Sequence, residues 1–149
     1  MAEVLFYHLT ESTLEEALPG LLEKSVERGW RAVVQTGTEE GRDALDAHLW
    51  TFRDDSFIAH ATDREAFPDE QAVLLTTSHD NLNGAQIRFL VDGAEPPDLS
   101  VYARAVFMFD GHDAMQLEAA RGHWKLMKTH GHAVTYWQQT PERRWERKA

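Results

Sequence analysis

The chain has 149 residues, of which 42% are hydrophobic and 27% are charged, and its formal net charge is −10. This length and composition predict a single globular domain with a sizeable hydrophobic core, and they exclude a disordered chain. Because the chain contains no cysteine, disulfides, a thiol nucleophile and Cys-ligated zinc are excluded. The excess of acidic residues disfavours wrapping by a long nucleic acid, because phosphate contacts dominate such binding.

The sequence also argues against a membrane or secreted location. The first residues, MAEVLFYHLTEST, have no basic segment before their short apolar run. No stretch reaches the roughly 18–20 apolar residues that are needed to cross a bilayer. We therefore expect a soluble, cytoplasmic protein with no membrane partner, and the absence of cysteine fits a reducing compartment.

A strand followed by a helix is predicted at the start of the chain. Residues 4–9 (VLFYHL) form a short apolar run that is typical of a buried strand. Apolar residues then recur at helical spacing over residues 14–26. Ser12 and Thr13 each precede a glutamate by three residues, which is capping-box spacing and marks the start of this helix. Pro19 offers a later start, because proline is favoured at the first helical position.

The rest of the chain continues to alternate between strand and helix patterns. Helices are expected at residues 38–50 and 112–130, the second of them bounded by Gly111 and Gly131. Strands are expected at residues 32–35, 57–61, 72–76, 87–91, 104–109 and 134–138. Segments rich in turn-forming residues separate the shorter strands.

This alternation predicts an α/β fold. We expect an open, Rossmann-like, mostly parallel sheet of about six to seven strands, flanked on both faces by about three main helices. A single domain would occupy residues 1–139, and residues 140–149 would form a polar, basic C-terminal tail.

Nucleotide binding is not favoured, although the predicted fold is of a kind that often binds nucleotides. The turn after the first strand, HLTEST, has no glycine that would let a pyrophosphate approach the backbone. The segment TGTEEG matches neither phosphate-binding pattern, and its two glutamates would repel phosphate at the start of a helix. We predict no cofactor.

A metal site is equally weakly indicated. His123, His130 and His132 offer three imidazoles near the end of the last predicted helix. No HExxH motif or set of carboxylates accompanies them. We predict no metal.

Asp110 and His112 are the best catalytic pair that the sequence offers. They follow a predicted strand and precede a helix, where active-site loops of α/β proteins often lie. An enzyme that acts on a phosphorylated or carboxylated metabolite is therefore one alternative function. The competing interpretation is structural, in which Asp113 and its neighbours cap the helix.

A basic segment stands out in this acidic chain. Residues 121–149 hold seven Lys and Arg against two Glu, a local charge of +5, whereas the first 120 residues carry −15. Arg121, Trp124, Lys125 and Lys128 are spaced to share one side of the last helix. This arrangement predicts a site for an anionic ligand, either a carboxylate-rich peptide or a phosphate chain. The alternative is a solvated helix surface with Trp124 in the core.

Several segments of the chain, taken in order, resemble one protein family. They are FYHL at residues 6–9, RGWRAVVQTG at 28–37, LW at 49–50, SFIAH at 56–60 and ARGHWKLMKTHGH at 120–132. Their combination is similar to the chi subunit of bacterial DNA polymerase III, a small accessory protein on the clamp-loader side of the replicase. The resemblance extends to about residue 139.

The resemblance implies a non-catalytic adaptor with a Rossmann-like sheet. Chi proteins bind the acidic, Phe-terminated C-terminal tail of single-stranded DNA-binding protein, so their connection to DNA is indirect. The family's tail site has an Arg, an aromatic residue and a Lys in one segment, which corresponds to Arg121, Trp124 and Lys125 here, with Lys128 one turn further along. Arginine can bind a carboxylate in a bidentate manner, and an indole can pack against a terminal phenylalanine.

The resemblance also implies a second partner, the psi subunit, which links chi to the clamp loader. The aromatic residue of the matching segment is Phe57, and Trp50 lies nearby in the sequence. Ala59 stands where that segment has a proline in the family.

Direct binding of single-stranded DNA is a third possible function. It would use Trp124, Trp137 and Trp145 as stacking platforms, together with the C-terminal cations.

Overall fold

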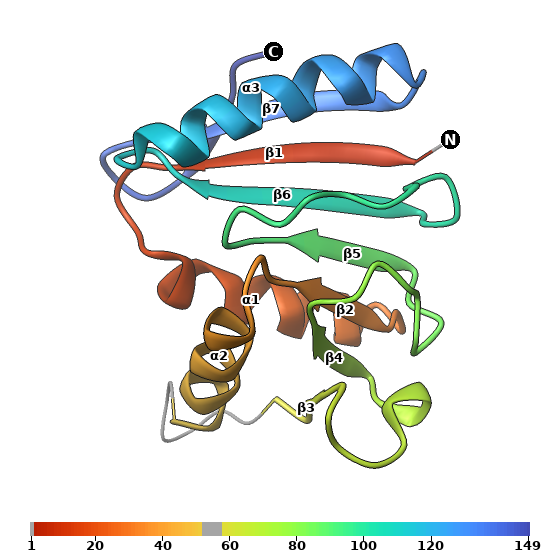
Figure 1. Cartoon of the computed structure of the whole chain (residues 1–149). Helices are drawn as coiled ribbons and strands as arrows, with labels where there is room; N and C mark the ends of the chain where they lie inside the picture. Colours follow the sequence, from red (N-terminus) through yellow and green to blue (C-terminus); the bar gives the residue numbers. More distant parts are fainter. Residues whose placement is uncertain (1, 52–57) are drawn as a thin grey trace.

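The strand and helix patterns fold into one sheet with helices on both faces (Figure 1). The structure is a computed structural model that describes residues 2–51 and 58–149. Its elements are β1 (Glu3–Leu9), α1 (Leu14–Glu27), β2 (Ala32–Gln35), α2 (Glu39–Thr51), β3 (Ala61–Thr62), the short 3₁₀ helix η1 (Pro68–Glu70), β4 (Val73–Thr76), β5 (Ile87–Leu90), β6 (Arg104–Asp110), α3 (Ala114–Thr129), β7 (Ala133–Gln139) and β8 (Trp145–Arg147). Among the described residues, no helix combines the length and apolar character of a transmembrane span.

The sheet is parallel except at one edge. Its strand order is β3-β4-β2-β5-β6-β1-β7-β8, and only β8 runs antiparallel to its neighbour. Helices α1 and α2 cover one face, and α3 lies along β1 and β7 on the other face (Figure 1). The predicted α/β class, the mostly parallel sheet and the three main helices are therefore confirmed.

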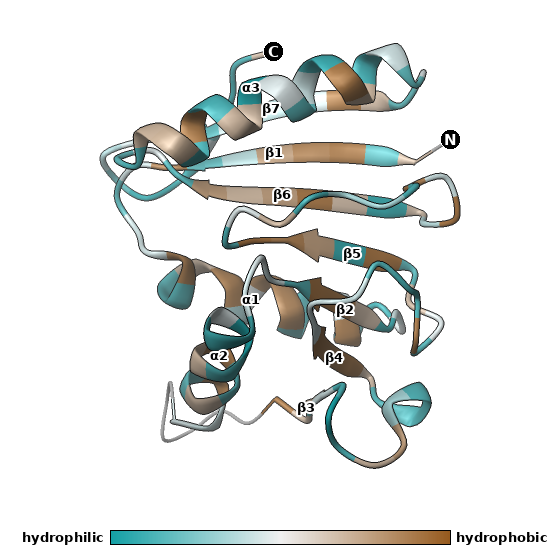
Figure 2. Ribbon diagram, in the orientation of Figure 1, coloured by the Kyte–Doolittle hydropathy of each residue, from teal (hydrophilic) through white to brown (hydrophobic). Residues whose placement is uncertain are grey.

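Each face of the sheet has its own hydrophobic core. On one face Leu18 and Leu22 of α1 pack against the strands, together with residues of α2. On the other face Ala120 and Met127 of α3 pack against β1, β6 and neighbouring loops. Because both faces are covered, β2 and β4 are apolar along most of their length instead of alternating, as Figure 2 shows.

The described residues form eight strands, against the six to seven predicted. The additional strand is β8, which lies within the segment 140–149 that we expected to be a polar tail. It is held by backbone pairing with β7 and by the Trp145 ring, whose centroid is 4.4 Å from that of Tyr7. The strand predicted at residues 57–61 is wrong over residues 58–60, which are not in a strand, since β3 contains only Ala61 and Thr62.

The helix starts follow their capping residues. Thr13 caps α1, and its side chain and that of Glu16 form the reciprocal bonds of a capping box, so the later start at Pro19 is wrong. The last helix starts at Ala114, two residues later than predicted, because Asp113 is its N-cap. The Asp113 carboxylate accepts hydrogen bonds from the first-turn N–H groups, which confirms the capping interpretation of this turn.

Candidate functional site

Helix α3 has a buried side and, next to it, a basic side. The buried residues are Ala120, His123 and Met127. The adjacent residues, which we call the basic stripe, are Arg121, Trp124, Lys125 and Lys128. The three cations of the basic stripe are exposed and its indole is half-buried. Residues three and four apart are neighbours on a helix, so these four side chains share one side of α3.

Trp124 joins the basic stripe to the core. Its ring meets the rings of Phe6 and Tyr136 edge-on, at centroid distances of 5.5 and 5.7 Å. The Lys128 ammonium lies 4.7 Å from the centroid of the Trp124 ring, a cation–π distance. One part of the indole therefore packs on β1 and β7, and another part is accessible beside a cation.

The cations of the basic stripe are not neutralised by the protein's own acids. Within the described residues, no carboxylate lies within 4.0 Å of the charged groups of Arg121, Lys125 or Lys128. The guanidinium and both ammonium groups are thus available to an external anion.

Tyr136 of β7 is a neighbour of the basic stripe that we did not predict. Burial raises the pKa of its hydroxyl, and the positive charge of Arg121 acts against this rise. The hydroxyl oxygen is 2.8 Å from Nδ1 of His8, with which it shares a hydrogen bond. Burial lowers the pKa of His8, as does the charge of His112, whereas Asp110 opposes both. The alternation of residues 134–138 predicts that the Tyr136 side chain points to one face of the sheet, but it does not predict which face that is.

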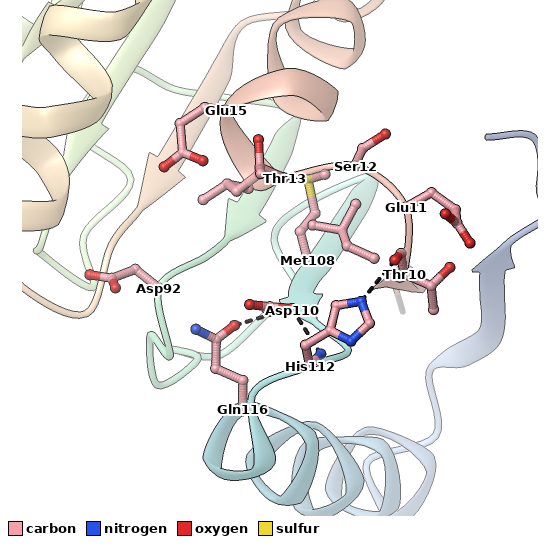
Figure 3. A pocket seen from close by; sticks show the side chains of 12 residues that line it. Thr10, Glu11, Ser12, Thr13, Glu15, Asp92, Met108, Asp110, His112 and Gln116 are labelled. Carbon is pink, nitrogen blue, oxygen red and sulfur yellow. Dashed lines mark hydrogen bonds between the residues drawn. The ribbon is translucent and has the colours of Figure 1, made fainter. Parts of the chain in front are cut away.

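A pocket of about 380 Å³ lies where β1 and β6 end (Figure 3). Asp110 and His112 both line it. The Asp110 carboxylate accepts a hydrogen bond of 2.8 Å from the backbone N–H of His112. The His112 ring donates through Nε2 to the carbonyl of Thr10, at 2.8 Å. Each side chain therefore bonds a backbone group, and the two side chains do not pair with each other.

The charge of this pocket opposes the substrates considered for it. Its lining includes the carboxylates of Glu11, Glu15, Asp92 and Asp110. These four carboxylates would repel a phosphorylated or carboxylated metabolite in the pocket. His112 thus holds the turn before α3 against the loop after β1, and the Asp110 carboxylate stabilises that turn from within. This geometry does not support the two residues as a catalytic pair.

Comparison with known proteins assigns the chain to a family. Residues 1–135 match the family described as DNA polymerase III chi subunit, HolC. The chain belongs to the DNA polymerase III chi family. A similar curated protein is the probable DNA polymerase III subunit chi of Rickettsia prowazekii (strain Madrid E), which is 24% identical over 100 residues. That match covers 67% of this chain and 59% of the relative's length.

The predicted psi-binding residues of this chi-family chain are only partly described. Trp50 lies in the last turn of α2, and 51% of its surface is exposed. Its ring centroid is 4.7 Å from that of His60. Phe57 lies outside the described residues. The structure therefore shows an accessible indole at the position predicted for Trp50.

The three tryptophans proposed for direct DNA stacking do not form one platform. Trp137 and Trp145 pack against the core on the α1 side of the sheet. Trp124 packs against the core on the opposite, α3 side. The three rings therefore do not form the single stacking surface that direct binding of DNA would use most simply.

The three histidines considered for a metal are placed by different contacts and do not form a common site. His123 is buried and its Nε2 is 3.2 Å from a Glu95 carboxylate oxygen. His132 accepts a hydrogen bond at Nδ1 from the N–H of Ala2. The ring of His130 lies 6.3 Å from that of His132. In residues 2–51 and 58–149, no group of three potential ligands is placed to hold a metal ion.

Proposed function

We propose that this chi-family chain is a non-catalytic adaptor of cytoplasmic DNA replication. In this proposal the basic stripe binds the acidic C-terminal tail of single-stranded DNA-binding protein, and another surface connects the chain to the clamp loader of the polymerase. The observation that carries the proposal is the set of unpaired cations beside a half-buried indole on α3.

The chemistry of the basic stripe suits an acidic chain end with a terminal aromatic residue. The Arg121 guanidinium can bind a carboxylate through two parallel hydrogen bonds, and Lys125 and Lys128 add positive charge nearby. The accessible part of the Trp124 ring offers an apolar surface for a phenylalanine side chain. The terminal carboxylate and the terminal ring of one residue would thus find complementary groups within one helical turn.

The charge of the rest of the protein supports selectivity. The first 120 residues carry −15 and would repel an acidic peptide over most of the surface. Binding would therefore concentrate at the C-terminal part of the chain. We expect an affinity in the micromolar range, about −8 kcal/mol, which weakens as salt screens the exposed charges.

Calorimetry with a synthetic tail peptide tests this assignment. The substitution Arg121→Ala should weaken binding by roughly 1.5–3 kcal/mol, because it removes a charge-assisted hydrogen-bond donor. Arg64→Ala is a matched control, since Arg64 is an exposed arginine in the loop after β3. A tail affinity that does not differ between Arg121→Ala and Arg64→Ala would remove the basic stripe as the site.

The connection to the clamp loader is the second part of the proposal. The exposed indole of Trp50 is the described residue that supports it, with Phe57 as its expected companion. Capture of clamp-loader proteins from a cell extract by the full chain, compared with Trp50→Ala, tests this surface. Because Trp50 and the basic stripe lie on different helices, Trp50→Ala should leave binding of the tail peptide unchanged. Equal capture by both forms would exclude Trp50 from the contact.

A further inference from the structure

A second pocket, of about 500 Å³, lies between α1 and the sheet on the face opposite to α3. Its lining includes Tyr7, Lys24, Arg28, Phe89, Arg104 and Val106. Its volume is in the range of pockets that bind small ligands. The pocket shares no lining residue with the basic stripe or with the pocket at the ends of β1 and β6.

Three cations surround this pocket. Lys24 and Arg28 come from the end of α1, and Arg104 comes from the start of β6. The guanidinium carbons of Arg28 and Arg104 lie 4.5 and 5.5 Å from the ring centroid of Trp30, which holds both groups in place. Two positively charged guanidinium groups beside one indole favour an anion between or near them.

Part of the polar lining has no partner within the described protein. Nε of Arg104 is buried and makes no hydrogen bond, although Nη2 of the same residue is 3.3 Å from a carboxylate oxygen of Glu3. The hydroxyl of Tyr7 also makes no hydrogen bond to a described residue, and burial raises its pKa, with the charge of Arg104 acting against that rise. Buried donors are seldom left without an acceptor, so Nε of Arg104 points to an acceptor that enters from outside. The Tyr7 hydroxyl, on a partly buried residue, is a further donor in the same lining.

The charge balance selects a monoanion. The three cations face two carboxylates, those of Glu27 in the lining and of Glu3 beside Arg104, which leaves a net charge of +1. The last turns of α1 contribute the negative end of a helix dipole, which disfavours a phosphate dianion. A carboxylate therefore matches the pocket better than a phosphate does.

The floor of the pocket selects an apolar group next to that carboxylate. Phe89 and Val106, together with Ile87, form the floor and are almost fully buried. A small hydrated anion would lose water against this floor without gaining hydrogen bonds there. A ring or branched alkyl group would instead take its own apolar surface out of water, because the floor side chains are already almost fully buried.

We propose that this pocket binds a monocarboxylate that carries an aromatic or apolar group, with the carboxylate at Arg104, Arg28 and Lys24 and the apolar group on the floor. The ligand is either a small organic acid or the carboxyl end of a peptide chain. This inference does not depend on the function of the basic stripe.

Titration of the ¹⁵N-labelled full chain with N-acetyl-L-phenylalanine tests the proposal. Amide and indole N–H resonances around Tyr7, Arg28, Trp30 and Arg104 should shift saturably, with a dissociation constant on the order of 1 mM for a ligand of this size. The uncharged N-acetyl-L-phenylalaninamide should bind about tenfold more weakly, because it lacks the charge that the guanidinium groups recognise. Equal shifts with the amide would overturn the proposal.

Three variants test whether the acid binds at this pocket. Arg104→Gln should weaken the acid about tenfold. Lys24→Gln changes an exposed residue, so it keeps the fold intact, and it should weaken binding about twofold. Arg121→Ala should remove any shifts at the basic stripe and leave those at the pocket. If Arg104→Gln unfolds the chain, Lys24→Gln decides, and full affinity in that variant would refute the assignment.

The two sources of the ligand are distinguished by a second acid. 3-Phenylpropionate has the ring and the carboxylate but no peptide group. Equal affinity for both acids supports a small organic acid, and tighter binding of N-acetyl-L-phenylalanine supports a peptide end. Absence of saturable shifts at the pocket with either acid contradicts the proposal as a whole.

Discussion

The two ends of the segment from β6 to α3 differ in charge and in what their side chains are bonded to. Where β6 ends, carboxylates line a pocket, and Asp110 and His112 are bonded to backbone groups of nearby loops. Further along α3, the cations of the basic stripe have no carboxylate partner in the described residues. Ligands of open α/β sheets usually bind at the carboxyl ends of the strands. Here that position is acidic, and the basic stripe lies on the surface of a helix instead.

This contrast separates residues that hold the fold from residues that offer charge to a partner. If it is correct, changes in the basic stripe act mainly on peptide binding, and changes at the strand ends act mainly on stability. Trp124 belongs to both groups, because its ring contacts the core and borders the cations.

Reversing the charge of Arg121 should have the largest effect on binding. Arg121→Glu removes the guanidinium and places a carboxylate against the acidic tail, so we expect at least a hundredfold loss of affinity, about 3 kcal/mol. Calorimetry with the tail peptide measures this loss. Arg64→Glu makes the same charge change away from α3 and should cost far less. Comparable losses in the two variants would mean that overall charge, and not a local site, governs binding.

Removing the Trp124 ring should affect both stability and binding. Trp124→Ala leaves a space beside Phe6 and Tyr136, and because the ring is only half-buried we expect a loss of about 2–3 kcal/mol in the free energy of unfolding. Trp124→Tyr keeps an aromatic ring and should retain most of the stability. Urea denaturation measures both values. An unchanged stability in Trp124→Ala would show that the ring does not contribute to the core.

The helical part of the site could be predicted because it depends on local periodicity. Residues 121, 124, 125 and 128 share one side of any regular helix, whatever the rest of the fold. Tyr136 could not be chosen in this way. Its position under α3 depends on the register between β1 and β7, which pairs Tyr136 with Phe6, a residue far away in the sequence. In the same way, the pairing of β2 with β5 and of β5 with β6 brings Trp30 near Arg104, and no local pattern contains that information.

The parts of the fold that were missed carry little hydrophobic pattern. Strand β8 is short and mostly charged, and it is defined by its pairing with β7 and the contact between Trp145 and Tyr7. Strand β3 contains two residues, too few to show an alternation. The central strands were predicted because both of their faces are buried, so their sequences are largely apolar, with the buried Arg88 of β5 as an exception.

Substitutions at the pocket where β1 and β6 end should lower stability and leave peptide binding unchanged, whereas substitutions in the basic stripe should act mainly on peptide binding. His112→Ala removes the hydrogen bond to the Thr10 carbonyl and should lower the free energy of unfolding by about 0.5–1.5 kcal/mol. Its affinity for the tail peptide should equal that of the unmodified chain. Thermal or urea denaturation and calorimetry on one preparation measure the two quantities. A large loss of peptide binding would contradict the separation of the two regions.

The smallest expected effect is a dependence of stability on pH through His8. Burial lowers the pKa of His8 in the folded chain, and neutral Nδ1 can accept the hydrogen bond of the Tyr136 hydroxyl, whereas protonated Nδ1 cannot. Between this lowered pKa and the unfolded value of about 6.5, the unfolded chain binds more protons. The stabilising contribution is therefore complete above about pH 6.5 and is lost as the pH falls through the folded pKa.

Urea denaturation at about pH 7.5 and about pH 5.5 measures this dependence. The free energy of unfolding should be lower at the acidic pH, and His8→Asn should reduce the difference. Some dependence should remain in His8→Asn, because burial, the N-terminal charge and His130 also lower the pKa of His132. A pH dependence in His8→Asn as steep as that of the unmodified chain would place the titrating group elsewhere. His8 bonds Tyr136, and the charge of Arg121 acts on the Tyr136 hydroxyl. A change in tail affinity over the same pH range would therefore show that the bond between His8 and Tyr136 also affects binding at the basic stripe.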